Sequence, residues 1–222
     1  MKVTTDSCLF GAWTASKLAN TTAKTMLDLG AGTGLLSLMC AQKSPELRID
    51  AIEIDNDASA QAKESFLASP WSDRINNLHG DIRNFSFEKT YDLVISNPPF
   101  YENELKPEQG QRRLAHHEGF QLTELFAITS KLLSQNGQFF FLLPYKRNQE
   151  IESLLKTNGL AANEHLLVRQ SKSHEPIRIL LSGCRLAETN SLDKSASEII
   201  IRNGDKYSDE FIELLKDYYL YL

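Results

Sequence analysis

The arrangement of residues best suited to chemistry in this sequence is an amide followed by two prolines at the end of an apolar run. Asn97, Pro98 and Pro99 come directly after "YDLVIS". The Asn97 side-chain oxygen and the Pro98 carbonyl can both accept hydrogen bonds from a planar amino group, which favours a tetrahedral nitrogen able to attack an electrophilic carbon. The prolines fix the backbone and remove N–H donors. The loop is therefore predicted to present acceptors.

Phe100 follows this amide and offers a flat face on which a planar ring can stack. The same residues also have a purely structural interpretation, in which the prolines end a strand and the phenylalanine packs in the core. Context favours the chemical interpretation, because the motif would follow the fourth strand of a fold whose first loop is rich in glycine. No metal is expected, since His116 and His117 are adjacent but lack further ligands at a chelating spacing.

The glycine-rich loop is "DLGAGTG", which begins at Asp28 and contains Gly30, Gly32 and Gly34. Glycines at such a strand-to-helix turn let the backbone turn sharply and approach a ligand, although they could also serve only the turn. The dinucleotide fingerprint needs a further glycine where this chain has Leu35, so a nicotinamide cofactor fits poorly. We assign Asp28 and the three glycines to a cofactor site.

Two acids stand at the ends of the next strands. Glu53 closes the second predicted strand, where a carboxylate can accept hydrogen bonds from both hydroxyls of a ribose, and Asp81 ends the third. Asp55 competes with Glu53 for that role. Either Glu53 or Asp81 could instead be a solvated charge at a strand end. The sequence thus places three acidic positions after three successive strands.

Alternating periodicities predict the elements that carry these loops. The whole chain, residues 1–222, is predicted to form a single Rossmann-like α/β domain with a mostly parallel sheet of about seven strands and helices on both faces. In such a sheet, ligands bind beyond the carboxyl ends of the strands. The strands are expected at 24–30, 48–54, 74–81, 91–97 and 137–144, and near 166–168 and 177–181. A C-terminal helix with an apolar stripe from Phe211 to Tyr219 is expected to pack in the core.

Composition restricts the setting of the protein. The chain has 222 residues, 41% hydrophobic and 24% charged, which suits a globular protein with a sizeable core. A formal net charge of -5 argues against unaided, non-specific binding to a polyanion but allows a local basic face. Three isolated cysteines favour a reduced, cytoplasmic location. We expect no membrane association, because no apolar run is long enough to cross a bilayer. The oligomeric state is left open.

These motifs resemble known families at three levels. D-x-G-x-G-x-G is similar to the loop of class I S-adenosylmethionine-dependent methyltransferases, and "NPPF" resembles the signature of amino-group methyltransferases that act on adenine, cytosine or glutamine. The opening "MKVTTDSCLFGAW", the segments "DLGAGTGLLSLMCAQ" and "SPWSDRI", and the tail "YSDEFIELLKDYYLYL" are similar to the bacterial tRNA1(Val) (adenine-37-N6)-methyltransferase family. In that family a short segment usually precedes the position of Met1.

The resemblance implies a cofactor and further site residues. It implies S-adenosyl-L-methionine as the methyl donor and a tRNA as the partner, with adenine 37 as the methylated base. It also implies that Asp81, with the neighbouring Ile82, meets the adenine of the cofactor, and that Thr5 and Asp6, in an N-terminal segment of residues 1–23, lie near its methionine end. Helix capping is the alternative role of Thr5 and Asp6.

The substrate is expected to meet the residues that follow the amide. We assign Pro99 and Tyr101 to substrate binding, and residues 101–119 to a basic flap in which Arg112 and Arg113 contact phosphates. A solvated loop without a partner is the alternative. Other possible RNA contacts are Lys146, Arg147, Lys172, Arg178 and Arg185.

Other functions are kept open. The same chemistry could act on a glutamine side chain or on an adenine of DNA or ribosomal RNA. The chain could also be a non-catalytic RNA-binding module that retains the fold, although a binder has no need for the acceptors of "NPPF". A nicotinamide oxidoreductase is the weakest alternative.

Overall fold

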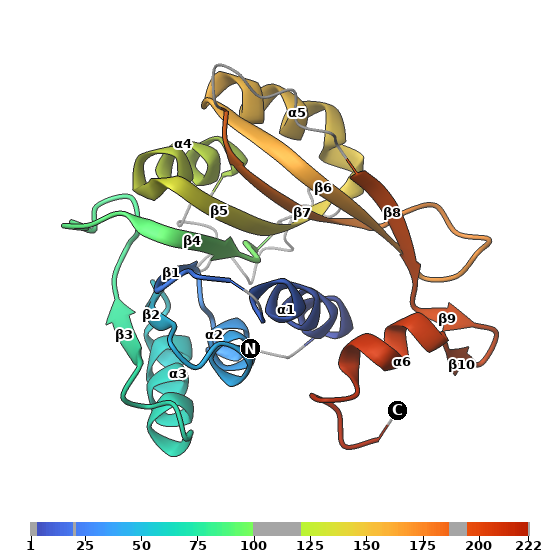
Figure 1. Cartoon of the computed structure of the whole chain (residues 1–222), viewed down its shortest axis with the longest axis horizontal. Coiled ribbons are helices and arrows are strands. Elements are labelled where there is room, and N and C mark those ends of the chain that lie inside the picture. Colours follow the sequence, from blue (N-terminus) through green and yellow to red (C-terminus); the bar gives the residue numbers. More distant parts are fainter. Residues whose placement is uncertain (1–3, 20, 100–120, 187–194, 222) are drawn as a thin grey trace, which may run out of the picture.

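A computed structural model shows an α/β fold built on one large sheet (Figure 1). The structure describes residues 4–19, 21–99, 121–186 and 195–221. The sheet has eight strands in the order β3-β2-β1-β4-β5-β7-β6-β8, and β7 alone runs antiparallel to its neighbours. The strands are β1 (Thr25–Leu29), β2 (Arg48–Glu53), β3 (Ile75–His79), β4 (Tyr91–Ser96), β5 (Leu133–Pro144), β6 (Leu160–Arg169), β7 (Arg178–Arg185) and β8 (Ser195–Ile200).

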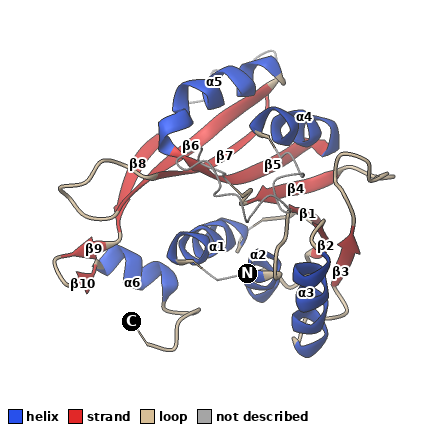
Figure 2. Cartoon of the chain, turned by 180° about the vertical axis from the view of Figure 1, so that it is seen from behind, coloured by secondary structure: helices blue, strands red, loops and turns tan. Residues whose placement is uncertain are grey.

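Helices cover both faces of the sheet, as the sequence predicted. One face carries α1, α2, α3 and α6, and the other carries α4 and α5 (Figures 1 and 2). A short 3-10 turn, η1, joins β5 to α5. The bounds are α1 (Thr5–Leu18), α2 (Leu35–Lys43), α3 (Asn56–Ala68), α4 (Leu122–Leu132), η1 (Tyr145–Arg147), α5 (Asn148–Thr157) and α6 (Asp209–Leu215).

The two faces of the sheet have separate cores because successive side chains of a strand point in opposite directions. In β5, Phe140 and Leu142 belong to the cluster packed under α1 and α2, whereas Phe139, Phe141 and Leu143 belong to the cluster under α4 and α5. All five side chains are buried. A continuous apolar run such as "FFFLL" is therefore required at the centre of a sheet that is covered on both sides.

The structure differs from the expected fold at its edge. It has eight strands where about seven were predicted, and the additional one is β8. Its burial pattern is mostly exposed, so "SASEII" lacks the apolar alternation that would have revealed it. A small antiparallel pair, β9 (Arg202–Asn203) and β10 (Lys206–Tyr207), follows it. The C-terminal helix is shorter than expected, but Phe211 and Leu215 are buried in the core as predicted.

Candidate active site

Asp28, Glu53, Asp81 and Asn97 lie at one edge of the sheet because the parallel strands β1 to β4 all end there. The strand order reverses between β1 and β4, and such a switch point is where open α/β sheets bind ligands. Ser96, the last residue of β4, donates its hydroxyl to the Leu29 carbonyl at 2.7 Å. This bond ties the ends of the two central strands together. The glycine loop and the amide motif therefore start from fixed, neighbouring points.

The glycine loop has the backbone geometry that its sequence predicted. Gly30, Gly32 and Gly34 have φ of 72°, 57° and 86°, a region that favours glycine. A Cβ at Gly30 would meet no atom within 4 Å, so this residue leaves open space beside the loop. A Cβ at Gly34 would lie 2.4 Å from the Phe66 ring. Packing of α2 against α3 thus accounts for Gly34, beside any contact with a cofactor.

Glu53 holds the glycine loop against the end of β2. One of its carboxylate oxygens accepts a hydrogen bond from the Gly32 amide at 2.7 Å, and the other accepts from the Asp55 amide at 2.8 Å. Asp55, the competing candidate for the ribose, is the N-cap of α3, and its side chain accepts a hydrogen bond from the Ala58 amide. Each carboxylate oxygen of Glu53 keeps a second lone pair, so the residue can fix the loop and still accept from a ribose.

Asp28 is the least satisfied acid of the site. It is fully buried, its Oδ2 accepts the Ser37 hydroxyl at 2.7 Å, and its Oδ1 has no hydrogen-bond partner. Burial raises the pKa of its carboxyl to about 7; the Ser37 hydrogen bond opposes this rise and the charge of Glu53 adds to it. A buried acceptor without a donor is costly, and a donor from a bound molecule would satisfy it. The residues present thus fit a cofactor with hydrogen-bond donors.

Asp81 lies beyond the end of β3, where the resemblance implied an acid. Its carboxylate receives a two-point hydrogen bond from Arg83, at 3.0 Å from Nε and 2.7 Å from Nη2. Ile82 is partly buried and packs against the core cluster under α4. The Arg83 pair fixes the direction of the Asp81 carboxylate.

Asn97 and Pro98 leave β4 in the expected place. Asn97 is partly buried, Pro98 is buried and Pro99 is exposed. The Asn97 side-chain nitrogen donates to the Ser7 hydroxyl at 2.8 Å, across 90 residues of sequence. Sequence reasoning missed Ser7, because its only signal was its place next to Asp6 in the opening segment.

Asp6 lies beside Ser7 in the first turn of α1. Thr4, the N-cap of α1, is hydrogen-bonded to both Asp6 and Ser7, and Arg178 of β7 approaches Asp6 Oδ2 at 3.3 Å. Thr5 is exposed in the first turn. The residue that caps α1 is therefore Thr4, and not Thr5 or Asp6, for which capping was the alternative role.

Some predicted site residues are not described by the structure, and others have structural partners. Phe100, Tyr101, Arg112 and Arg113 fall outside the described residues, as does the whole flap of residues 101–119. Arg185 donates to the carbonyls of Ser130 and Leu133, and Arg147 pairs with Glu150, so both have structural partners.

Within the described ranges, no group of three or more potential metal ligands is found. In the same part of the chain, no helix has the length and hydropathy of a membrane span.

Comparison with known proteins first defines a class. Residues 12–165 match the family model "Methyltransferase small domain". A predicted O-methyltransferase from Agrobacterium tumefaciens superposes with a TM-score of 0.65 at 17% identity over 94% of each chain. A putative RNA methyltransferase from Pyrococcus horikoshii gives 0.59 at 19% identity over 83% of each. The protein is a class I S-adenosylmethionine-dependent methyltransferase.

Sequence comparison then narrows the class. The tRNA1(Val) (adenine(37)-N6)-methyltransferase of Pseudoalteromonas translucida is 36% identical over 99% of this chain and 92% of the relative. The enzyme of the same name from Flavobacterium psychrophilum is 37% identical over 99% of this chain and 93% of its own length. The chain belongs to the tRNA1(Val) (adenine(37)-N6)-methyltransferase family.

Proposed function

We propose that this protein transfers a methyl group from S-adenosyl-L-methionine to the exocyclic N6 of adenine 37 in a valine tRNA. The observation that supports this most directly is the placement of Asn97 and Pro98 at the switch point of the sheet, one strand away from the glycine loop. The family to which the chain belongs gives the acceptor base. We also propose that the reaction takes place in the cytoplasm.

The cofactor would be held by residues of the first three strand ends. Asp28 offers its unpaired Oδ1 to a donor, Glu53 offers lone pairs to the ribose hydroxyls, and Asp81 with Ile82 borders the adenine. Thr5 and Asp6 are proposed to border its other end. When bound, the cofactor supplies an electrophilic methyl group on a positively charged sulfur.

The chain's own residues prepare the acceptor nitrogen. The lone pair of an adenine amino group is delocalised into the ring, so the nitrogen is a poor nucleophile while it is planar. The Asn97 Oδ1 and the Pro98 carbonyl accept its two hydrogens and favour the tetrahedral form. Pro99, Phe100 and Tyr101 are proposed to hold the base. No strong general base is needed, because the methylated nitrogen becomes acidic and loses its proton readily.

The decisive experiment combines mapping with one substitution. Full-length protein, labelled S-adenosylmethionine and unmodified valine tRNA are incubated, and the digested tRNA is examined by mass spectrometry for methyl at adenine 37. Asn97→Ala is expected to lower the rate about 100- to 1000-fold, since it removes one acceptor, while the cofactor still binds.

Parallel reactions with DNA and with a glutamine-containing peptide test the other acceptors. A wild-type protein that binds the cofactor but methylates no RNA would refute the proposal, and methyl transfer only to DNA or peptide would support the alternative acceptors.

We propose that the tRNA also contacts a hollow at the same edge of the sheet. The loop between β6 and β7 and the turn between β9 and β10 line a hollow of about 470 Å³. β6 runs parallel to β5, so its end lies on the edge that carries Asn97. The lining includes Lys172, His174 and Arg202, together with hydroxyls of Ser171 and Ser173. Such groups suit phosphate oxygens.

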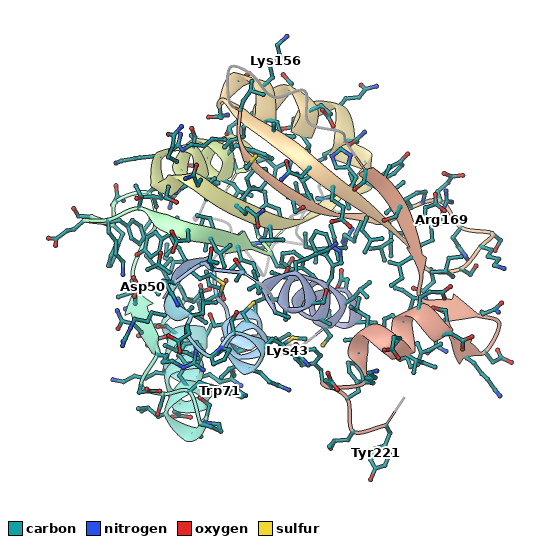
Figure 3. The ribbon with its side chains drawn as sticks, viewed as in Figure 1. Lys43, Asp50, Trp71, Lys156, Arg169 and Tyr221 are labelled. Carbon is teal, nitrogen blue, oxygen red and sulfur yellow. The ribbon has the colours of Figure 1, made fainter. Side chains whose placement is uncertain are left out.

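Salt-dependent binding tests this surface. Lys172→Ala combined with Arg202→Ala is expected to weaken tRNA binding and to lower the slope of log K against log salt by up to about two, because two phosphate contacts are lost. The charge-matched control replaces two exposed lysines, Lys63 on α3 and Lys156 on α5. Figure 3 labels Lys156. Equal slopes for the two double variants would exclude the hollow as a tRNA contact.

A further inference from the structure

The amide that would act on the substrate is held by a residue of the N-terminal helix α1. Within the described residues, the side-chain hydrogen bond of Asn97 is the one its nitrogen donates to Ser7 Oγ at 2.8 Å. A side-chain amide has an oxygen and an NH2 group of similar shape, and only the oxygen can accept hydrogens from an amino group. Whatever fixes the rotation of this amide therefore determines whether Asn97 attracts or repels the acceptor base.

The direction of the bond to Ser7 is fixed by the next residues in the network. The Thr4 hydroxyl donates its hydrogen bond to the Asp6 carboxylate oxygen Oδ1. The Thr4 oxygen then accepts from the Ser7 hydroxyl, 2.7 Å away. Because the Ser7 hydroxyl proton is used in this bond, the Ser7 oxygen can only accept from Asn97, and it therefore pairs with the NH2 group of the Asn97 amide. A flipped amide would set two acceptor oxygens against each other.

The origin of this network is anchored on both sides. The Ser7 backbone N–H donates to Asp6 Oδ1 at 3.1 Å, and Arg178 Nε lies 3.3 Å from Asp6 Oδ2. Arg178 begins β7, which is paired to β5 and β6 within the sheet. The carboxylate is thus tied to α1 and to the sheet, and the order of donors and acceptors starts from a fixed point.

We propose that Ser7 is a positioning residue that turns the Asn97 amide so that its oxygen faces the amino group to be methylated. Ser7 acts through Asn97 and touches neither the methyl donor nor the base. The inference rests on the proposed function, because it needs an acceptor whose amino group Asn97 must bind. It adds a residue of α1 to the reaction, with a role distinct from cofactor binding.

Substitution of Ser7 by Ala removes the acceptor without burdening the helix, since alanine is a good helix former. Wild-type kcat and KM are first measured on whichever acceptor proves to be methylated. Ser7→Ala is then expected to lower kcat roughly 10- to 100-fold, because the amide is no longer held in one rotation. KM values for the acceptor and the cofactor are expected to stay within about twofold of wild type, on the same argument of lost positioning without lost contacts.

Ser16→Ala is the matched control on the same helix. Its hydroxyl donates to the Trp13 carbonyl and belongs to none of the bonds above, so it is expected to retain wild-type kinetics. Ser7→Thr keeps the hydroxyl and is expected to recover most of the lost kcat. If α1 were generally disturbed, kcat would fall in both Ser7→Ala and Ser16→Ala, or Ser7→Thr would fail to restore it.

A double-mutant cycle tests whether Ser7 acts through Asn97. In an Asn97→Ala background, Ser7→Ala should cause no further loss of kcat, because there is no amide left to orient. Additive losses in the double variant, or an unchanged kcat in Ser7→Ala alone, would overturn the proposal. An inactive wild-type protein would instead refute the proposed function, so the two failures are distinguishable.

Discussion

Two aspartates on the neighbouring central strands β1 and β4 have opposite surroundings. Asp92, near the start of β4, accepts hydrogen bonds from the Lys24 and Thr25 amides and from the Thr25 hydroxyl. Partial burial raises the pKa of its carboxyl, but these bonds outweigh burial and leave the pKa below its usual value. Asp28, near the end of β1, is completely buried, has one oxygen without a partner, and has a pKa raised to about 7.

If Asp28 binds the cofactor as proposed, the difference separates an acid that stabilises the fold from one that binds a ligand. Asp50 on β2 follows the Asp92 pattern, since Tyr91, Lys89 and Asn76 all bond to it and its pKa is lowered despite burial (Figure 3). Both satisfied acids lie in the half of the sheet away from the glycine loop. The carboxylates of Asp50 and Asp92 thus have complete sets of hydrogen-bond partners, whereas Asp28, at the proposed cofactor site, keeps one oxygen without a partner.

The largest expected effect is a loss of cofactor affinity when Asp28 is replaced. Asp28→Asn keeps an acceptor for Ser37 but removes the charge, so a charge-assisted bond of about 1.5–3 kcal/mol to the cofactor is lost. Affinity for S-adenosylmethionine, measured by calorimetry, is then expected to fall roughly 10- to 150-fold. Asp92→Asn is the matched control and should leave the affinity unchanged. Equal affinity of wild type and Asp28→Asn would break the comparison.

The same variant is expected to have the opposite effect on the cofactor-free fold. Below the unfolded pKa of about 4, Asp28 is protonated in both states; between about 4 and about 7 the native state alone holds the proton. The contribution of this group to stability is therefore full below pH 4 and is lost as pH rises through 7. Urea unfolding should show that the free energy of unfolding of Asp28→Asn rises relative to that of wild type as pH increases from about 4 to about 7. A difference that does not change with pH would contradict the assignment.

A smaller effect is expected at Asp92. Asp92→Asn weakens the bonds to the start of β1 and should lower the free energy of unfolding by about 1–2 kcal/mol at neutral pH. Because the folded pKa of Asp92 is depressed, its stabilisation is present above the unfolded pKa and is lost as pH falls through the folded value. The variant should therefore approach wild-type stability in acid. A deficit that persists there would point to packing instead.

Much of this fold and site could be predicted from local patterns. Buried strands read as short apolar runs bounded by turn residues, and the glycines of the first loop show where the chain must turn, so β1 to β5 and the position of Asn97 were predicted within a few residues. Strand β8 was missed because an exposed edge strand has no apolar alternation.

The contacts that complete the site could not be predicted in the same way. The bond between Ser7 and Asn97 joins residues 90 positions apart, and the approach of Arg178 to Asp6 spans 172. Spacing along the chain carries no signal for such pairs. Likewise, only the positions of α2 and α3 show that Gly34 must lack a side chain to make room for Phe66.

The insertion of β7 between β5 and β6 has a consequence for how the protein is made. Until residue 185 has left the ribosome, the nascent sheet ends at β5, and both β5 and β6 expose backbone groups that nothing pairs. The guanidinium that braces the first helix is also carried on that late strand. A polypeptide stopped before this point would contain the glycine loop and Asn97 but would lack β7 and the Arg178 contact to Asp6, so the sheet and this brace of α1 are completed only near the end of synthesis.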